Sequence, residues 1–273
     1  MDYRPLGNSG LQVSVLGMGC GRLARRSKRS VRLGSIAAAR AALENGVNFF
    51  DTADCYSAGL SERILGYLTR GRRSDVVIAT KCGRAVSPAS RLSTGWRAST
   101  CFDPDYVVRA LEHSLRRLRM DYVDVFLLHS PPLSVLEHGD AVAALLRARD
   151  AGKTRAVGVS LRSGAGVESL RVLRGLDCVE LELNRASLPS TLQLASELQR
   201  GGVGVIARQP FGSGVLLREG GVGVTDCLTF ALGCPCATVV AGMSSRSQFD
   251  RNSSVVAKVS MTAERDGRTS TGA

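Results

Sequence analysis

The sequence predicts a (β/α)8 TIM barrel, in which parallel strands alternate with helices around one closed sheet. Eight short, almost wholly apolar runs alternate along the 273 residues with eight longer segments of helical periodicity. Runs that are apolar on both faces are typical of parallel strands covered by helices. An open doubly wound sheet is the second possibility, but no G-x-G-x-x-G motif joins the first run to the first helical segment. Closure into a barrel is therefore favoured.

Each strand is predicted from a run of aliphatic, often β-branched residues, and each helix from apolar residues three or four positions apart. The predicted strands are residues 15–18, 47–50, 76–80, 123–128, 156–159, 178–183, 203–207 and 238–241. The predicted helices are residues 34–45, 61–69, 104–117, 140–151, 167–174, 191–200, 226–233 and 247–256. Two helix starts carry capping signals, namely Asp103 before Pro104 and Ser61 before Glu62.

A β-hairpin is predicted before the first barrel strand. Residues 3–6 and 11–15 flank the turn sequence Gly-Asn-Ser-Gly, and glycine and asparagine favour tight hairpin turns. Two long irregular segments, 22–33 and 82–103, each follow a predicted strand. They are therefore expected at the face formed by the carboxyl ends of the strands, where barrel enzymes place their active-site loops.

The composition predicts a single cytoplasmic domain over residues 1–273, with residues 258–273 as a flexible polar tail. The sequence has no run of eighteen apolar residues and no secretory signal pattern, so no membrane association is expected. The formal net charge of +12 could favour nucleic acid, but the basic residues are dispersed and no nucleic-acid-binding motif accompanies them. A smaller anionic partner, such as a phosphorylated cofactor, suits the positive charge better.

No metal site is predicted. The eight cysteines are expected to be reduced, and most of them to be small core residues. The sequence Cys234-Pro-Cys236 has neither the redox CxxC spacing nor a paired zinc-ligand spacing. The chain also contains only three histidines, which makes a structural zinc site improbable.

Four polar side chains at or just after predicted strand ends are the candidate catalytic residues: Asp51, Tyr56, Lys81 and His129. Lys81 is one of only four lysines, and Asp51 on the neighbouring strand can supply its counter-charge. A cation beside Tyr56 would lower the pKa of the phenol towards physiological pH, and His129 could exchange a hydrogen bond at the same point. Each residue alone could have an ordinary structural role. Their convergence on one barrel mouth favours an active site.

Several stretches, in the right order and with barrel spacing, resemble one known family. The most specific is residues 114–124, running on to His129; the others are residues 6–14, 51–56, 61–66, 79–81, 152–160 and 242–246. Over nearly its whole length the chain resembles the aldo-keto reductases, which are NADPH-dependent carbonyl reductases on a (β/α)8 barrel. The resemblance implies that the N-terminal hairpin closes the bottom of the barrel.

The resemblance also implies a mechanism. Tyr56 is then the general acid that protonates the carbonyl oxygen as hydride arrives, Lys81 tunes its phenol, Asp51 fixes Lys81, and His129 orients the carbonyl. The implied function is NADPH-dependent reduction of an aldehyde or ketone to an alcohol. Two alternatives stay open, namely a biosynthetic tailoring redox enzyme that uses the same site and a cofactor-binding regulatory subunit without significant turnover.

The implied NADPH site falls into three groups of residues. The carboxamide region would be contacted by Ser160, Glu180 and Asn184. The pyrophosphate would be covered by Arg208, Pro210, Phe211, Gly212, Ser213, Gly214 and Leu216. The adenosine and 2′-phosphate would be held by Gly242, Ser244, Arg246, Gln248 and Asn252. Four positions depart from the family pattern: Ser57, Leu161, Glu180 and Arg251.

The small-molecule carbonyl substrate is expected to bind between the loops 82–103 and 131–139. Trp96, the only tryptophan, lies in the first of these loops and is predicted to line the pocket or to anchor the loop. Arg246 and Arg251, near the implied adenosine end, favour NADPH over NADH because a guanidinium pairs well with a phosphate. The sequence leaves the oligomeric state open.

Overall fold

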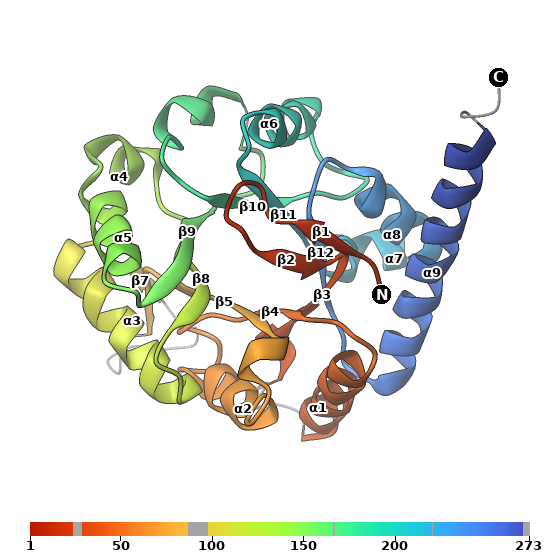
Figure 1. The fold of residues 1–273 in the computed structure, drawn as a ribbon, viewed down its shortest axis with the longest axis horizontal. Coiled ribbons are helices and arrows are strands. Elements are labelled where there is room, and N and C mark those ends of the chain that lie inside the picture. Colours follow the sequence, from red (N-terminus) through yellow and green to blue (C-terminus); the bar gives the residue numbers. More distant parts are fainter. Residues whose placement is uncertain (24–28, 87–97, 166, 220, 270–273) are drawn as a thin grey trace.

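A computed structural model confirms the predicted barrel (Figure 1). It describes residues 1–23, 29–86, 98–165, 167–219 and 221–269. Eight parallel strands close in the order β10-β11-β12-β3-β4-β5-β8-β9. They are β3 (Leu16–Gly19), β4 (Phe49–Asp51), β5 (Val77–Cys82), β8 (Val123–His129), β9 (Thr154–Ser160), β10 (Cys178–Glu182), β11 (Gly204–Arg208) and β12 (Thr238–Gly242). Each predicted strand overlaps one of them.

The helices surround the barrel on the outside (Figure 1). They are α1 (Arg29–Glu44), α2 (Leu60–Leu68), α3 (Pro104–Leu118), α4 (Leu133–His138), α5 (Asp140–Asp150), α6 (Pro189–Arg200), α7 (Val215–Glu219), α8 (Val224–Gly233) and α9 (Arg246–Thr269). Short 3-10 segments are η1 (Cys20–Arg22), η2 (Arg73–Asp75), η4 (Val167–Val172) and η5 (Gly212–Gly214). An antiparallel ribbon of β6 (Arg84–Val86) and β7 (Ala98–Thr100) follows β5.

The predicted N-terminal hairpin covers one end of the barrel, in front of the strands in Figure 1. It consists of β1 (Tyr3–Pro5) paired with β2 (Gln12–Ser14). Its fully buried Leu6 belongs to the same apolar cluster as the inward-facing barrel residues. Gly7 has a φ of +54°, and a Cβ there would lie 2.3 Å from the backbone nitrogen of Gly204. Glycine therefore lets the turn approach the start of β11 closely.

The core has two layers, because successive strand residues face opposite sides of the sheet. The inner layer fills the barrel with residues such as Phe49, Val125 and Ile206. The outer layer packs the strands against the helices, with residues such as Phe50, Phe126 and Val205. This double burial explains why the strands are apolar at nearly every position.

Three helix predictions were wrong in their extent or type. The helix predicted at 34–45 begins earlier, at Arg29, so the segment 22–33 is only partly irregular. The helix predicted at 167–174 is the 3-10 segment η4, which ends at Val172. The helix predicted to end at Val256 continues as α9 to Thr269. The capping signal at Asp103 is confirmed, since its side chain accepts hydrogen bonds from the backbone N–H groups of Asp105 and Tyr106 at 3.0 and 3.1 Å.

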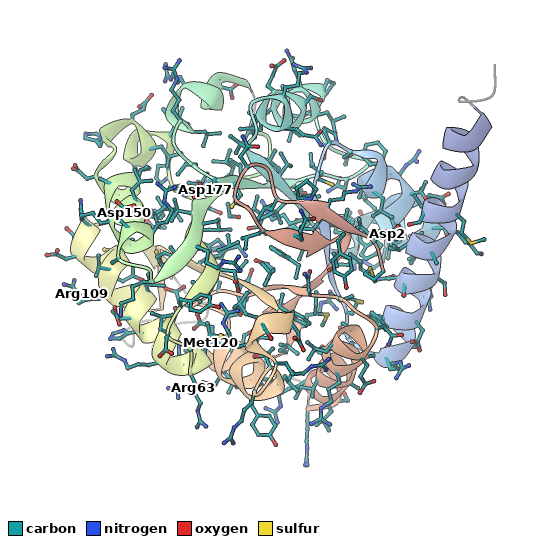
Figure 2. The ribbon with its side chains drawn as sticks, viewed as in Figure 1. Asp2, Arg63, Arg109, Met120, Asp150 and Asp177 are labelled. Atoms are coloured by element: carbon teal, nitrogen blue, oxygen red, sulfur yellow. The ribbon has the colours of Figure 1, made fainter. Side chains whose placement is uncertain are left out.

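Charged side chains lie mainly on the outer helices, where Figure 2 shows Arg63 and Arg109 extending away from the barrel. This arrangement agrees with the dispersed basic residues of the sequence. None of the helices in the described part of the chain is both long and apolar enough to cross a membrane. Several buried polar side chains, among them Asp51, Lys81, His129 and Glu180, lie towards the carboxyl ends of the strands, away from the hairpin.

Candidate active site

The barrel brings the four candidate catalytic residues together at the carboxyl ends of its strands. Asp51 is the last residue of β4, Lys81 is the last but one of β5, and His129 is the last of β8. Tyr56 lies in the turn between β4 and α2. Because β4, β5 and β8 are consecutive neighbours in the closed sheet, their ends meet at one side of the opening. All four side chains line the same cavity.

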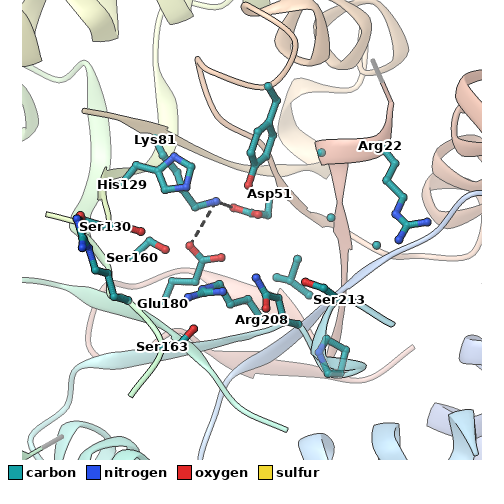
Figure 3. Close-up of a pocket in the computed structure, with 18 of the residues that line it drawn as sticks. Arg22, Asp51, Lys81, His129, Ser130, Ser160, Ser163, Glu180, Arg208 and Ser213 are labelled. Atoms are coloured by element: carbon teal, nitrogen blue, oxygen red, sulfur yellow. Dashed lines mark hydrogen bonds and ion pairs between the residues drawn. The ribbon is translucent and has the colours of Figure 1, made fainter. Parts of the chain in front are cut away.

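Lys81 is the centre of this group, and only 1% of its surface is exposed. Its ammonium forms an ion pair with Asp51 and donates a hydrogen bond to the backbone oxygen of Thr52 at 3.2 Å. A second carboxylate, that of Glu180 on β10, lies 3.3 Å away (Figure 3). The predicted contact with Asp51 is therefore present, whereas the contact with Glu180 was not predicted.

Thr80, the residue before Lys81 in β5, links the strand to the surrounding helices. Thr80 donates a hydrogen bond to Glu62 at 2.7 Å, and Arg117 donates one to the other oxygen of Glu62 at 2.5 Å. Glu62 is fully buried, so these charge-assisted bonds compensate its desolvation. They tie α2 and α3 to β5 directly beside Lys81.

Tyr56 is half-buried, and its ring lies close to Lys81 and His129. The ammonium nitrogen of Lys81 lies 5.9 Å from the ring centroid, and the ring of His129 packs edge-on with a centroid separation of 6.0 Å. Burial raises the pKa of the Tyr56 phenol, although the charge of Lys81 acts in the opposite direction. The predicted net lowering of this pKa is thus wrong for the site without ligands, because desolvation outweighs the cation.

His129 is held in its neutral form. Burial, together with the positive charges of Lys81 and Arg84, lowers its pKa to about 2. Its Nδ1 lies 3.6 Å from the sulfur of Cys55. A neutral imidazole has one nitrogen that donates and one that accepts, so His129 can donate a hydrogen bond to a substrate oxygen without titrating near neutral pH.

The cavity in front of these residues has a volume of about 700 Å³. Seven of the predicted cofactor residues line it: Ser160, Glu180, Arg208, Pro210, Phe211, Ser213 and Gly242. Figure 3 shows Ser130 and Ser163 on one side of the Asp51–Lys81–Glu180 group and Arg22 on the other, with Ser213 on the same side as Arg22. The cavity is therefore elongated, and the catalytic candidates lie along its middle.

The other predicted cofactor residues lie outside this lining: Asn184, Gly212, Gly214, Leu216, Ser244, Arg246, Gln248 and Asn252. Asn184 is buried and donates to the backbone oxygen of Gln209 at 3.1 Å, which shapes the loop after β11. Gln248 accepts a hydrogen bond from the backbone of Ser244 at 2.6 Å. Arg246 is exposed and bonded to Asp250 at 2.8 Å. Trp96 lies outside the described residues.

Several lining residues were not named individually as site residues from the sequence, chiefly Gly19, Gly21, Arg22, Arg84, Ser130, Arg162, Ser163 and Gln209. The glycine-rich run 17–21 was a usable signal of close approach between backbone and ligand, but from the sequence we noted only that this run lacks the spacing of the dinucleotide-binding motif. Of the two loops predicted to form the pocket, 82–103 contributes Arg84. No residue of 131–139, which contains α4, lines this cavity.

The end of the cavity near Arg22 is suited to phosphate groups. Arg22 donates to the hydroxyl of Ser244 at 3.0 Å and keeps its remaining donors for other partners. Gly242 faces it without a side chain, and a Cβ there would meet only Arg22, at 4.0 Å. An extended, doubly phosphorylated ligand could thus approach the backbone at this end.

In the described part of the chain, no three His, Cys, Asp or Glu residues are grouped so that they could hold a metal ion. One departure from the family pattern has a visible local effect, since Ser57 has a φ of +51°, a region that favours glycine. It lies directly after Tyr56, in the turn that positions the ring.

A sequence model of the Aldo/keto reductase family matches residues 15–222. The chain belongs to the aldo-keto reductase family. It is 32% identical to the L-galactose dehydrogenase of Arabidopsis thaliana over 232 residues, which cover 81% of this chain and 68% of that protein. It is 30% identical to the aldo-keto reductase YhdN of Bacillus subtilis over 191 residues, or 67% of this chain and 54% of that protein. The chain thus matches about half the length of YhdN.

Solved aldo-keto reductase structures have the same fold. The Pseudomonas aeruginosa protein PA4992 superposes with a TM-score of 0.78 at 27% identity, covering 94% of both chains. The holo form of the aldo-keto reductase AKR11C1 from Bacillus halodurans gives a TM-score of 0.76 at 26% identity, covering 94% of this chain and 91% of that one. The protein is accordingly an oxidoreductase of this family, whose members typically use NAD(P)H and small-molecule substrates.

Proposed function

We propose that this aldo-keto reductase interconverts an aldehyde or ketone and the corresponding alcohol by hydride transfer with NADP(H). The observation that carries the proposal is the buried Asp51–Lys81 ion pair beside Tyr56 and the neutral His129, on the wall of one elongated cavity. A protein that only bound the cofactor would not need a proton donor, a cation beside it and a hydrogen-bond donor at the same place. This arrangement disfavours the regulatory-subunit alternative.

The residues supply proton transfer and charge stabilisation. When bound, the reduced nicotinamide supplies the hydride. A substrate carbonyl oxygen placed between Tyr56 and His129 would accept a hydrogen bond from each and then the phenolic proton of Tyr56. Burial keeps this phenol protonated at neutral pH, so the acid is available for reduction. As the phenolate forms, Lys81 stabilises its charge, and Asp51 holds Lys81 in place.

The cavity can hold NADP(H) with the nicotinamide at its middle, beside Lys81, and the phosphates towards Arg22. Ser160 and Glu180, beside Lys81, would face the nicotinamide carboxamide, and Ser213 and Arg208 the pyrophosphate. Arg22, bonded to Ser244, would face the 2′-phosphate, a role that the sequence had assigned to Arg246. We propose this reassignment because Arg246 is paired with Asp250 and lies outside the lining.

The substrate is proposed to be a small polar molecule. The side of the cavity away from Arg22 is lined by Ser130, Ser163, Arg84 and Arg162, which can donate or accept hydrogen bonds. The similarity to a protein named L-galactose dehydrogenase supports hydroxylated aldehydes or their cyclic forms as candidates. A tailoring role in biosynthesis would use the same groups and differ only in the substrate.

The decisive experiment measures cofactor absorbance at 340 nm with a panel of aldehydes, ketones, quinones and aldoses, in both reaction directions. Turnover with at least one carbonyl–alcohol pair is expected. If calorimetry shows cofactor binding but no member of a broad panel reacts, the regulatory-subunit alternative replaces the proposal. Turnover that occurs only with quinones would contradict the assigned carbonyl chemistry.

The cofactor assignment predicts the effect of replacing Arg22. Arg22→Ala should weaken NADPH binding by roughly tenfold to a hundredfold, since a charge-assisted hydrogen bond is worth about 1.5–3 kcal/mol. NADH lacks the 2′-phosphate, so its affinity should change little. Titration by fluorescence quenching would measure both dissociation constants.

Two control variants make that test specific. Arg246→Ala should have the smaller effect because its guanidinium is already paired, and Arg63→Ala, on the outer face of α2, should have none. Equal losses for NADPH and NADH after Arg22→Ala would place this residue against the pyrophosphate instead. A larger loss for Arg246→Ala would restore the original assignment.

A further inference from the structure

Glu180 is a buried carboxylate whose negative charge has no role in the catalytic scheme above. It lies on β10, only 1% of its surface is exposed, and its side chain lines the cavity. Its Oε2 is 3.3 Å from the ammonium nitrogen of Lys81, yet it accepts no hydrogen bond from a described residue. Figure 3 shows the carboxylates of Glu180 and Asp51 approaching the ammonium of Lys81 from different directions. A buried carboxylate oxygen without a donor is costly unless a ligand compensates it.

The charges around Glu180 do not cancel. Asp51 and Glu180 share a single cation, Lys81, so these three buried groups carry one surplus negative charge when both carboxylates are ionised. Burial and Glu180 raise the pKa of Asp51 to about 7, so this surplus is fully present above neutral pH. Arg208 on β11 also lines the cavity, but its guanidinium is paired with Glu182 at 3.5 Å and donates to the backbone oxygen of Leu161 at 3.0 Å.

The remaining titratable groups on this part of the wall do not supply a buried cation. His129 is neutral, because burial lowers its pKa to about 2, and the phenol of Tyr56 is protonated at neutral pH. Arg84, on β6, is exposed to solvent, where its field is screened. The surplus negative charge therefore faces the space where a ligand would bind.

From this arrangement we infer that Glu180 sets the redox preference of the site, favouring the oxidised, positively charged nicotinamide over the reduced, neutral one. The inference rests on the proposed function. A ring positioned for hydride transfer beside Tyr56 and Lys81 must also lie near Glu180, because Glu180 is in contact with Lys81. When both carboxylates are ionised, the buried charges sum to zero beside an oxidised ring, whereas one negative charge stays uncompensated beside a reduced ring.

The same preference bears on the hydride-transfer step. A site that stabilises the oxidised ring more than the reduced one makes the bound reduced cofactor the stronger hydride donor, so on the protein the balance moves towards reduction of a carbonyl compound to an alcohol. In that step the carbonyl carbon accepts a hydride, which carries two electrons, and the carbonyl oxygen accepts the phenolic proton of Tyr56, which solvent then replaces. Carbonyl compound, reduced cofactor and one proton are thus converted to alcohol and oxidised cofactor. Burial raises the pKa of the Tyr56 phenol and keeps it protonated, as this direction requires.

The test compares the affinities of the two cofactor forms, a readout that is independent of turnover. Isothermal titration calorimetry of the wild-type protein with NADP⁺ and with NADPH should give tighter binding of NADP⁺. Glu180→Gln keeps the shape but removes the charge, and it should shift the ratio of the two dissociation constants by on the order of tenfold towards NADPH. Glu180→Asp keeps the charge and should retain most of the wild-type ratio.

Glu197→Gln is the matched control, because it removes one carboxylate from a partly exposed position on α6, outside the cavity, and should leave the ratio unchanged. Wild-type protein that binds NADPH as tightly as NADP⁺ or more tightly would overturn the inference, even if Glu180→Gln failed to fold. A ratio that changes less than twofold in folded Glu180→Gln would also overturn it. If neither cofactor form binds the wild-type protein, the proposed function itself fails.

Discussion

Tyr56→Phe should lower turnover by about a hundredfold to ten-thousandfold, the usual contribution of a general acid or base. The substitution removes only the hydroxyl that exchanges a proton with the substrate, in whichever direction the reaction runs. The ring, its edge-on contact with His129 and its position near Lys81 would remain. Steady-state rates at saturating cofactor would measure the loss.

Cofactor affinity and thermal stability should stay close to the wild-type values in this variant, since the Tyr56 hydroxyl has no hydrogen bond to another described residue. Tyr67→Phe provides a matched control, because Tyr67 is 69% exposed on α2, away from the cavity. It should change neither turnover nor stability. Near-wild-type turnover of Tyr56→Phe would contradict the assignment and make His129 the candidate proton donor.

The barrel itself could be predicted because burial of its strands and helices imposes apolar patterns that are visible in short stretches of sequence. A strand buried on both faces must be apolar at nearly every position, as Val123–His129 is, and most such runs are followed by an amphipathic helix. Helix ends were harder to predict. Nothing in the polar sequence after Val256 demands that α9 continue, and the apolar spacing of 167–174 does not distinguish an α-helix from the tighter turns of η4.

The candidate site was predictable where neighbouring strands define it. Asp51 and Lys81 end consecutive strands, so their contact follows from strand order alone. Glu180 belongs to β10, which β8 and β9 separate from β5, and only closure of the barrel brings it to Lys81. Arg22 and Ser244 are likewise far apart in the sequence, and the parallel pairing of β3 with β12 brings them together. No local pattern signals such contacts.

The electrostatics of Tyr56 show a second limit of reasoning from residue types. A lysine beside a phenol lowers the pKa of the phenol, and this effect is present in the structure. The size of the opposing desolvation depends on how deeply the ring is buried and on the carboxylates of Asp51 and Glu180, which the sequence does not place. The direction of the pKa shift was therefore predicted incorrectly, although the interacting pair was identified.

Lys81→Met should have the largest combined effect, on both turnover and stability. Turnover should fall about as far as in Tyr56→Phe, because the phenolate formed at Tyr56 would lose its stabilising cation. The substitution would also leave the carboxylates of Asp51 and Glu180 buried without a counter-charge. Breaking a buried ion pair on one side typically costs about 3–5 kcal/mol of the free energy of unfolding.

This loss of stability should depend on pH, with a sign that follows from proton linkage. In the wild-type protein, burial and the neighbouring Glu180 already raise the pKa of Asp51 to about 7, against the attraction of Lys81. Without Lys81 that pKa should rise further, so the folded variant would bind protons more tightly than the unfolded chain does. Its stability would be fully present below the ordinary carboxyl pKa of about 4 and would be lost as the pH rises through and beyond 7.

Urea unfolding of Lys81→Met at pH 5 and pH 8 would test this expectation, with the wild-type protein measured in parallel. The deficit relative to wild type should be clearly larger at pH 8. The double variant Lys81→Met/Asp51→Asn removes one of the two unpaired charges, so it should recover part of the stability without recovering turnover. A deficit that is equal at both pH values, or a double variant no more stable than Lys81→Met, would show that lost side-chain packing, rather than uncompensated charge, governs the stability of this site.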